Sequence, residues 1–136
     1  MIELAPSILA ADFAHLADQV REAAAGGGTV IHVDIMDGHF VPNLTMGPPL
    51  VKSLRQATEL PLARHLMIEH AAQFIPAFCA AGANWLSVHQ AACAHLTRPL
   101  HLIKDPGCRP GVVHPPANPV DPPTEVPSLS HSLAMT

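Results

Sequence analysis

Apolar positions along the chain fall into short strand-like runs separated by stretches with helical spacing. After Asp12, a candidate N-cap, apolar residues recur at the three- and four-residue spacing of an amphipathic helix that ends at Gly26–Gly28. Further helices are predicted near Pro49–Gln56, Ala71–Ala81 and Ala94–Lys104. The predicted strands are Ile2–Ala5, Val30–Met36, Leu62–Met67, Trp85–His89 and Arg109–Val113.

This alternation predicts an α/β fold with a parallel sheet. Strand starts recur roughly every 22–32 residues, which is the length of a βα unit, and such units build parallel sheets with right-handed crossovers. The chain holds four units and the start of a fifth. A closed (β/α)8 barrel needs about 250 residues and at least about 200, whereas this chain has 136. The sequence therefore predicts either a small open sheet or about half a barrel.

The last residues of the chain differ from the rest in composition. Nine of the 15 prolines lie in residues 99–136, and the stretch from Val120 to Thr136 is rich in Pro and Ser without any helical or strand period. Proline fixes φ and removes a backbone hydrogen-bond donor. We therefore expect a partial (β/α) barrel over residues 1–119 and a disordered tail over residues 120–136.

Composition and charge narrow the functional class. Hydrophobic residues make up 49% of the chain, and its formal net charge is −4, which lacks the basic surface typical of nucleic-acid-binding proteins. No run of about 18 apolar residues predicts a membrane span, and no basic residue precedes Arg21, so no secretory signal is expected. Three cysteines without C-x-x-C spacing suit a reducing compartment. We expect a cytoplasmic protein with no nucleic-acid or membrane partner.

Two strand ends carry the residues with the clearest chemistry. His32, Asp34 and Met36 alternate and so share one face of their strand, and His65 and Met67 repeat that spacing on the next strand. Adjacent parallel strands would bring His32, Asp34 and His65 within reach of one ion. Two imidazoles and a carboxylate suit Zn²⁺, Fe²⁺, Mn²⁺ or Co²⁺. The sequence therefore predicts a divalent-metal site with open positions for a substrate oxygen.

Taken singly, these residues have ordinary structural explanations. A histidine at a strand end is structural more often than not, Met36 and Met67 could fill a core, and Asp37-Gly38 alone would be a turn. The combination at two strand ends nevertheless favours a functional site. Six other histidines follow no shared pattern and are expected at the surface or in loops: His39, His70, His95, His101, His114 and His131.

Four segments resemble the ribulose-phosphate 3-epimerase family. They are Ala5–Phe13, His32–Asn43, His65–Glu69 and Gly82–His89, and they occur in that family's order and spacing. The resemblance covers about residues 2–119, where Gly111–Pro119 is similar to a loop after the fifth strand. A sibling family that acts on allulose 6-phosphate shares most of these motifs.

The resemblance implies a TIM barrel with a divalent metal at its C-terminal mouth. It implies interconversion of D-ribulose 5-phosphate and D-xylulose 5-phosphate in the pentose phosphate pathway, by metal-assisted removal of the C3 proton through an enediolate. His32, Asp34 and His65 match the family's metal ligands, and Asp34 also matches a catalytic carboxylate. The positions that face the substrate are matched by Ser7, Met36, His65 and Met67.

The chain also departs from the family's pattern. The implied barrel is truncated to about the first four to five strands, so the family's second catalytic Asp and its glycine-rich phosphate loops have no counterpart. The Asp residues present are Asp12, Asp18, Asp34, Asp37, Asp105 and Asp121. Ala63-Arg64 replaces the family's usual Asp-Val, and Arg64 is predicted to face the helix layer. Of the site that the resemblance implies, the sequence thus supplies three of four metal ligands, one of two acid/base groups and no phosphate-binding loop.

Three functional hypotheses follow. The first is an epimerase by descent. The second is a non-catalytic metal-binding fragment that pairs with itself or with a full-length epimerase. An open parallel sheet leaves an unpaired edge and an uncovered apolar face, so a homo-oligomer or another pairing is expected. The third is a non-haem iron oxygenase with a two-His-one-carboxylate site, although that set usually lies on a β-sandwich.

Overall fold

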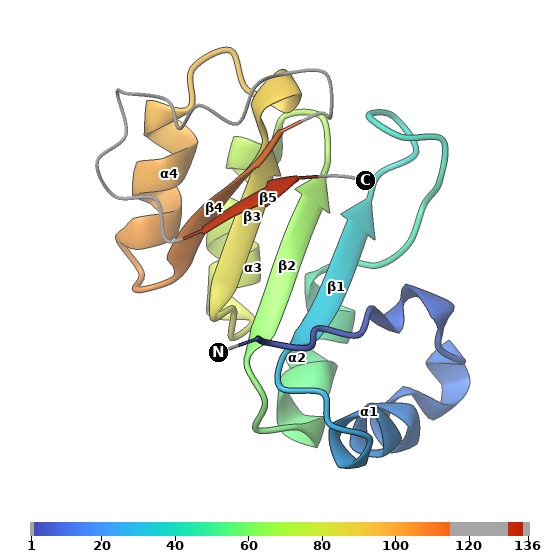
Figure 1. Cartoon of the computed structure of the whole chain (residues 1–136). Coiled ribbons are helices and arrows are strands. Elements are labelled where there is room, and N and C mark those ends of the chain that lie inside the picture. Colours follow the sequence, from blue (N-terminus) through green and yellow to red (C-terminus); the bar gives the residue numbers. More distant parts are fainter. Residues whose placement is uncertain (1, 115–130, 135–136) are drawn as a thin grey trace.

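One parallel sheet forms the centre of the computed structural model, which describes residues 2–114 and 131–134 (Figure 1). Neighbouring strands of the sheet are also neighbours in the sequence, and all four pairs are parallel. Such an order arises when consecutive βα units are laid side by side. The strands are β1 (Ile31–Met36), β2 (Leu62–Met67), β3 (Trp85–His89), β4 (Arg109–His114) and β5 (His131–Ala134).

Helices precede β1 and connect the strands as far as β4. They are α1 (Leu16–Ala25), α2 (Pro48–Ala57), α3 (Ile75–Ala80) and α4 (Thr97–Lys104). Short 3-10 helices lie at η1 (Ile8–Ala10), η2 (Phe13–His15), η3 (Ala71–Gln73) and η4 (Gln90–Ala92). α2 and α3 lie behind the sheet as drawn in Figure 1, with α4 beside them. The predicted α/β class is confirmed, and the parallel sheet with its flanking helices is consistent with a partial TIM barrel. In the described part of the chain, every helix is too short or too polar to cross a bilayer.

The expected first strand is extended but forms no ladder. Instead of a strand over Ile2–Ala5, the chain makes an isolated parallel bridge between Ser7 and His32. The Pro6 carbonyl accepts a hydrogen bond from the His32 N–H at 2.9 Å. Because Pro6 has no N–H, this segment cannot exchange a full set of hydrogen bonds with its neighbour. The N-terminal segment nevertheless lies along β1, which places Ser7 beside the functional strand.

Three predicted helices are shorter in the structure, one of them α4, which begins at Thr97 and not near Ala94. The expected helix over Ala71–Ala81 is divided at Phe74 into η3 and α3, with Pro76 in the first turn of α3, where its missing N–H costs least. Asp12 is confirmed as a cap, but it caps η2 by accepting from the Ala14 N–H at 2.9 Å. The first α-helix then starts at Leu16.

Part of the expected tail is a strand. Residues 131–134 form β5, which pairs with β4 in the register Gly111↔His131 to His114↔Ala134, so the expectation of disorder is wrong for these four residues. They follow Pro127, the last proline of the chain, and therefore have the backbone donors that a ladder needs. Residues 115–130 and 135–136 lie outside the described residues, and the rest of the domain assignment stays a prediction.

Alternation along β1 separates a core face from a site face. Ile31, Val33 and Ile35 are buried, whereas His32 and Asp34 on the other face are half-buried. β2 is buried at all six positions, so both of its faces are covered. The core face packs against residues from the helices, among them Val51, Leu54, Ile75, Phe78, Leu100 and Ile103. Burial of this apolar face fixes which residues point to the site.

Arg64 is an exception within that core. Its exposed fraction is 1%, and all three guanidinium nitrogens lack a hydrogen-bond partner among the described residues. Burial lowers the pKa of Arg64 to about 10, partly offset by the nearby thiols of Cys108 and Cys79. The guanidinium therefore stays charged at neutral pH in a place where no described residue replaces its lost hydration. The predicted position in the helix layer is confirmed.

Arg55, in the same helix layer, differs from Arg64 because its guanidinium has hydrogen-bond partners. It donates to the Asn84 Oδ1 at 3.0 Å and to the Leu60 carbonyl at 2.9 Å, and also to the Thr58 carbonyl. Its stem lies against Gly82, where a Cβ would come within 2.8 Å of the Arg55 side chain. Arg55 thus joins α2 to the turns that precede β2 and β3.

The two arginines lead to opposite predictions for one substitution. We expect Arg64→Met to raise the free energy of unfolding by about 1–3 kcal/mol, because the variant keeps the side-chain length and removes an unpaired buried charge. Arg55→Met is the matched control, and it should lower stability because three backbone and side-chain acceptors lose their donor. Urea denaturation followed by circular dichroism measures both. A destabilised Arg64→Met would mean that the guanidinium has partners outside the described residues.

Candidate active site at the ends of strands β1 and β2

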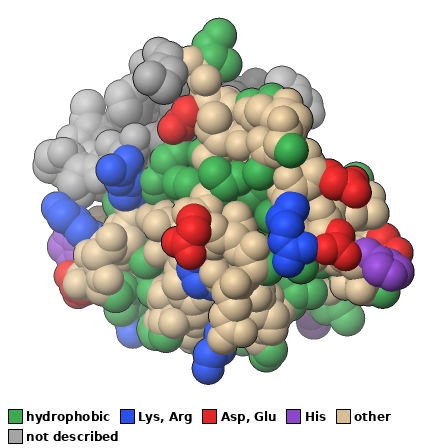
Figure 2. All heavy atoms as spheres, turned by 90° about the horizontal axis from the view of Figure 1, so that it is seen from below, with side chains coloured by type: hydrophobic (Ala, Val, Ile, Leu, Met, Phe, Trp, Pro, Cys, Tyr) green, Lys and Arg blue, Asp and Glu red, His purple; other side chains and the backbone are tan. Residues whose placement is uncertain are grey.

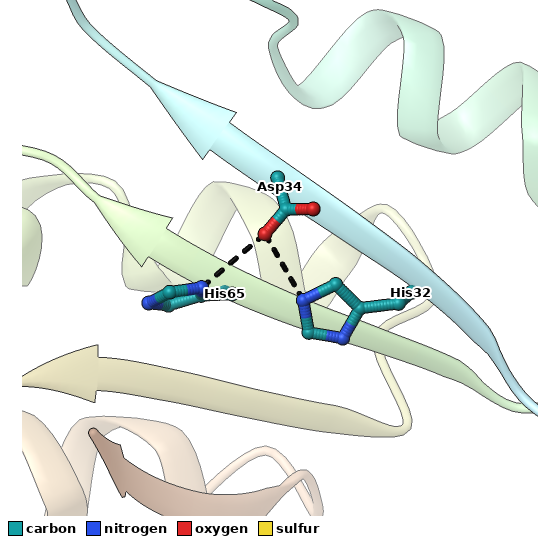
Figure 3. A group of neighbouring side chains, drawn as sticks. All are labelled: His32, Asp34 and His65. Atoms are coloured by element: carbon teal, nitrogen blue, oxygen red, sulfur yellow. Dashed lines mark hydrogen bonds and ion pairs between the residues drawn. The ribbon is translucent and has the colours of Figure 1, made fainter. Parts of the chain in front are cut away.

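The carboxyl ends of β1 and β2 bring together three side chains that the sequence singled out. Asp34 lies directly opposite His65 in the parallel register, and His32 lies two residues before Asp34 on the same face. Figure 3 shows the two imidazoles converging on one oxygen of the Asp34 carboxylate. The period-two alternation and the parallel pairing together account for this arrangement.

The distances make this group a candidate metal site. The Asp34 Oδ1 lies 3.0 Å from the His32 Nε2 and 3.3 Å from the His65 Nδ1. Each of the three residues offers one ligand atom, and these atoms lie within 4.8 Å of one another. No other group of three or more His, Cys, Asp or Glu residues in the described part of the chain brings its ligand atoms close enough to hold one ion. Two imidazole nitrogens and one carboxylate oxygen form a donor set that suits a divalent transition metal.

The surroundings of Asp34 hold its carboxylate in the charged form. Burial alone would raise the pKa of Asp34, but hydrogen bonds with His32, His65 and Ser7, together with the charge of His32, lower it below its ordinary value. The Ser7 hydroxyl donates to the Asp34 Oδ2 at 2.6 Å. Ser7 also caps η1 by accepting from the Leu9 N–H at 3.2 Å. The Ser7 hydroxyl therefore ties the N-terminal segment to the carboxylate, in addition to the backbone bond between Pro6 and His32.

Thr45 fixes the backbone on which Asp34 stands. Its hydroxyl donates to the Asp34 carbonyl at 2.8 Å and accepts from the Met36 N–H at 3.0 Å. The Asp37 carboxylate accepts from the backbone N–H groups of His39, Phe40 and Glu69, which ties the loop after β1 to the loop after β2. The sequence indicated only a turn at Asp37, and it gave no signal for Thr45.

His89, at the end of β3, is a member of the site that sequence reasoning did not single out. Its Nε2 lies 2.8 Å from the His65 Nε2, and the two rings stack with centroids 4.8 Å apart. Burial, together with His65 nearby, lowers the pKa of His89 to about 4. His89 does lie in the Gly82–His89 segment of the family resemblance, and the parallel order β2–β3 could have pointed to it. The sequence pattern alone did not relate it to His65.

Met36 and Met67 lie two residues beyond Asp34 and His65, toward the carboxyl ends of β1 and β2. Met36 and Met67 are partners in the β1–β2 register, on the same face as Asp34 and His65. Met67 is 4% exposed and Met36 is half-buried. Together they place two thioether side chains directly beyond the carboxylate.

The other acids and histidines of the described residues lie elsewhere. Asp12 and Asp18 pair with His15 and Arg21 on the surface, and Asp105 is exposed at the end of α4. Asp121 and any phosphate-binding loop after Gly111 lie largely outside the described residues. The expectation of surface positions is confirmed for His39, His70, His95 and His101, which are exposed.

The fold is shared with solved enzymes of very different sequence. The 7,8-dihydropteroate synthase from Vibrio fischeri ES114 matches 93% of this chain and 48% of its own, with a TM-score of 0.64 at 10% identity. A Yersinia pestis dihydropteroate synthase matches 82% of this chain and 45% of its own, with a TM-score of 0.61 at 13% identity. At this identity the likeness concerns the fold alone. Fold and site together define the chain as a parallel (β/α) protein with a carboxylate–histidine site at its strand ends.

The relatives by sequence are more specific. The chain belongs to the ribulose-phosphate 3-epimerase family, whose pattern matches residues 3–136. The ribulose-phosphate 3-epimerase of Bacillus subtilis is 54% identical over 120 residues, which are 88% of this chain and 55% of that protein. The Escherichia coli K12 protein of the same name is 47% identical over 118 residues, 86% of this chain and 52% of that protein. The chain thus spans about half the length of the curated relatives it matches.

The structure predicts that Thr45 stabilises the strand that carries Asp34. In Thr45→Val the methyl group replaces the hydroxyl, so the Asp34 carbonyl and the Met36 N–H each lose a partner. We expect a loss of about 1–3 kcal/mol in the free energy of unfolding. Thr97→Val, at the exposed first residue of α4, is the control and should change stability by less than about 0.5 kcal/mol. Equal effects in the two variants would contradict the role of Thr45.

Proposed function

We propose that this chain carries the proton-abstracting half of a ribulose-phosphate 3-epimerase, which interconverts D-ribulose 5-phosphate and D-xylulose 5-phosphate. The observation that supports it best is the Asp34 carboxylate, held anionic between two imidazoles and the Ser7 hydroxyl at the ends of two parallel strands. The names of the relatives favour this reaction over a non-catalytic fragment. The parallel sheet also differs from the β-sandwich that usually carries the iron oxygenase site.

His32, Asp34 and His65 would hold one divalent cation. Their three ligand atoms already converge, and the charged carboxylate would offset part of the cation's charge. The mixed nitrogen and oxygen donors suit Zn²⁺, Fe²⁺, Mn²⁺ or Co²⁺. When bound, such a cation would act as a Lewis acid that stabilises the negative charge of an enediolate.

Asp34 is the group that would remove the C3 proton. A proton next to a ketone is weakly acidic, so its removal needs a carboxylate within hydrogen-bond reach of that carbon. The Asp34 Oδ2 accepts a hydrogen bond from the Ser7 hydroxyl, and this hydroxyl can turn to a substrate oxygen. Met36 and Met67 would cover the reacting carbons with apolar surface that excludes water and does not compete for protons.

Inversion at C3 needs a second acid on the opposite face of the intermediate. Among the described residues, no further carboxylate joins the group around Asp34. The proposal therefore requires an acid from outside them, on this chain or on a second polypeptide. The same holds for the groups that would bind the substrate phosphate.

A second polypeptide would also cover apolar surface at the N-terminal edge of the sheet. Ile2 and Leu4 are 95% and 56% exposed, and Figure 2 shows hydrophobic side chains gathered in one area of the face at the lower ends of the strands. Exposed apolar edges favour association. We therefore propose that the chain pairs with a second copy of itself or with another chain.

We also propose a cytoplasmic location. There the three free thiols would remain reduced, namely those of Cys79, Cys93 and Cys108.

The proposed metal site predicts one Co²⁺ per chain. Titration of the metal-free protein with Co²⁺ should give a visible d–d spectrum that saturates at one equivalent. His32→Ala and His65→Ala should each weaken binding strongly, because each removes one of three ligands. His39→Ala, on an exposed loop histidine, is the matched control. Equal spectra for all four proteins would place the cobalt elsewhere.

The proposed base predicts isotope exchange even where inversion is incomplete. In D₂O with bound metal, the chain should exchange the C3 hydrogen of D-ribulose 5-phosphate for deuterium, because removal and return of the proton on one face need Asp34 alone. Asp34→Asn should lower the exchange rate by at least about 100-fold, whereas the surface variant Asp18→Asn should not. NMR of the sugar phosphate, recorded after the metal is chelated, measures the exchange.

A coupled assay for D-xylulose 5-phosphate, run beside the exchange, tests the second half of the reaction. Exchange without xylulose 5-phosphate would mean that Asp34 acts and that no second acid is present. Exchange with xylulose 5-phosphate would mean that a second acid reaches the site from outside the described residues. Neither exchange nor product, from a protein with its metal bound, would contradict the proposed function.

A further inference from the structure

A third imidazole lies behind the two at Asp34, on the next strand. His89 ends β3, is 7% exposed, and places its Nε2 at 2.8 Å from the Nε2 of His65. Its ring is in contact with two others: the Phe40 ring centroid lies 5.0 Å away and the His65 centroid 4.8 Å away. Three elements therefore fix the His89 ring, namely β3, β2 and the loop after β1. The contact between the nitrogens is short, buried and held in place.

Two ring nitrogens at hydrogen-bond distance share one proton. If both carried a hydrogen, the two hydrogens would clash, and if neither did, two lone pairs would face each other. One ring therefore donates and the other accepts. Because a neutral imidazole carries its single proton on either Nδ1 or Nε2, the direction of this bond also decides the state of the opposite nitrogen of His65. That opposite nitrogen, Nδ1, is the atom 3.3 Å from the Asp34 Oδ1.

We propose that His89 is a positioning residue that accepts a hydrogen bond from the Nε2–H of His65. With a cation in place of the hydrogen bond between His65 and Asp34, this arrangement would keep the proton of His65 on Nε2 and leave its Nδ1 as a bare lone pair directed at that cation. Partners of this kind commonly orient ligand histidines and raise their basicity. The inference rests on the proposed function, since it assigns His65 as a ligand, and it adds a role for a residue outside the ligand set.

Two substitutions at one position separate the hydrogen bond from the packing. His89→Phe keeps an aromatic ring between Phe40 and His65 but has no acceptor, whereas a glutamine in His89→Gln can place its Oε1 near the position of the lost Nε2. We expect His89→Phe to weaken Co²⁺ binding by about 10–100-fold and His89→Gln to restore most of the affinity. Competition with a chromophoric chelator measures the dissociation constants. His95→Phe, on an exposed histidine, should bind Co²⁺ as the wild type does.

The direction of the bond has its own readout in the wild-type protein. Long-range ¹H–¹⁵N NMR of the Zn²⁺-loaded chain should find the His65 proton on Nε2 and the His89 proton on Nδ1. A His65 proton on Nδ1, or His89→Phe with wild-type affinity, would overturn the proposal. So would His89→Gln with the same loss as His89→Phe. If His89→Phe does not fold, the NMR result and His89→Gln decide.

Failure of this inference can be told apart from failure of the proposed function. A wild-type chain that binds no Co²⁺ contradicts the metal site and with it the proposed function. A wild-type chain that binds Co²⁺, with His89→Phe unaffected, contradicts only the role of His89.

Discussion

The parallel register between β1 and β2 is the constraint on which the site depends. It sets Asp34 opposite His65, and alternation then sends Arg64 to the other face of the same strand. A slip of one residue would exchange the two, with the guanidinium at the site and the imidazole among the helices. What prevents the slip is the apolar face itself: Leu62 and Leu66 belong to the hydrophobic core, and a slip would replace them there with Ala63 and Met67. The chemistry of the site is therefore fixed by residues that take no part in it.

Local signals predicted most of the fold. The bounds of β2 and β3 agree with the apolar runs, because strands buried between layers read as continuous runs in the sequence. Local sequence did not predict secondary structure that depends on contacts with distant segments. The N-terminal segment lacks a ladder because of Pro6, and residues 131–134 form a strand because they pair with the edge of β4. The site followed the same rule. His32, Asp34 and His65 were predictable from spacing and parallel order, whereas Thr45 and His89 depend on contacts between a loop and a strand, or between two strands, that no periodicity reports.

Arg64 shows how far the two faces of the sheet are independent. A guanidinium without a hydrogen-bond partner among the described residues conflicts with the apolar residues around it, yet the side chains at positions 63 and 65 point away from it. The sheet backbone lies between the two environments, so the charge opposes folding without contacting the carboxylate. A cost to stability on one face is thus compatible with an ordered group of ligands on the other, and changes on the helix face need not alter the site.

On the site face, the polar side chains form one connected hydrogen-bond network. Asp34 Oδ1 is contacted by two imidazoles and Oδ2 by one hydroxyl, so three side chains stabilise the charged carboxylate. A cation between Asp34, His32 and His65 would take over that stabilising role and would require bare nitrogens from both rings. The proton of His65 would then have to be carried by its other nitrogen, which lies within hydrogen-bond distance of His89. Under the proposal, occupation of the site on β1 and β2 would thereby depend on a residue of β3, and the unit that would hold the cation would be three parallel strands rather than two.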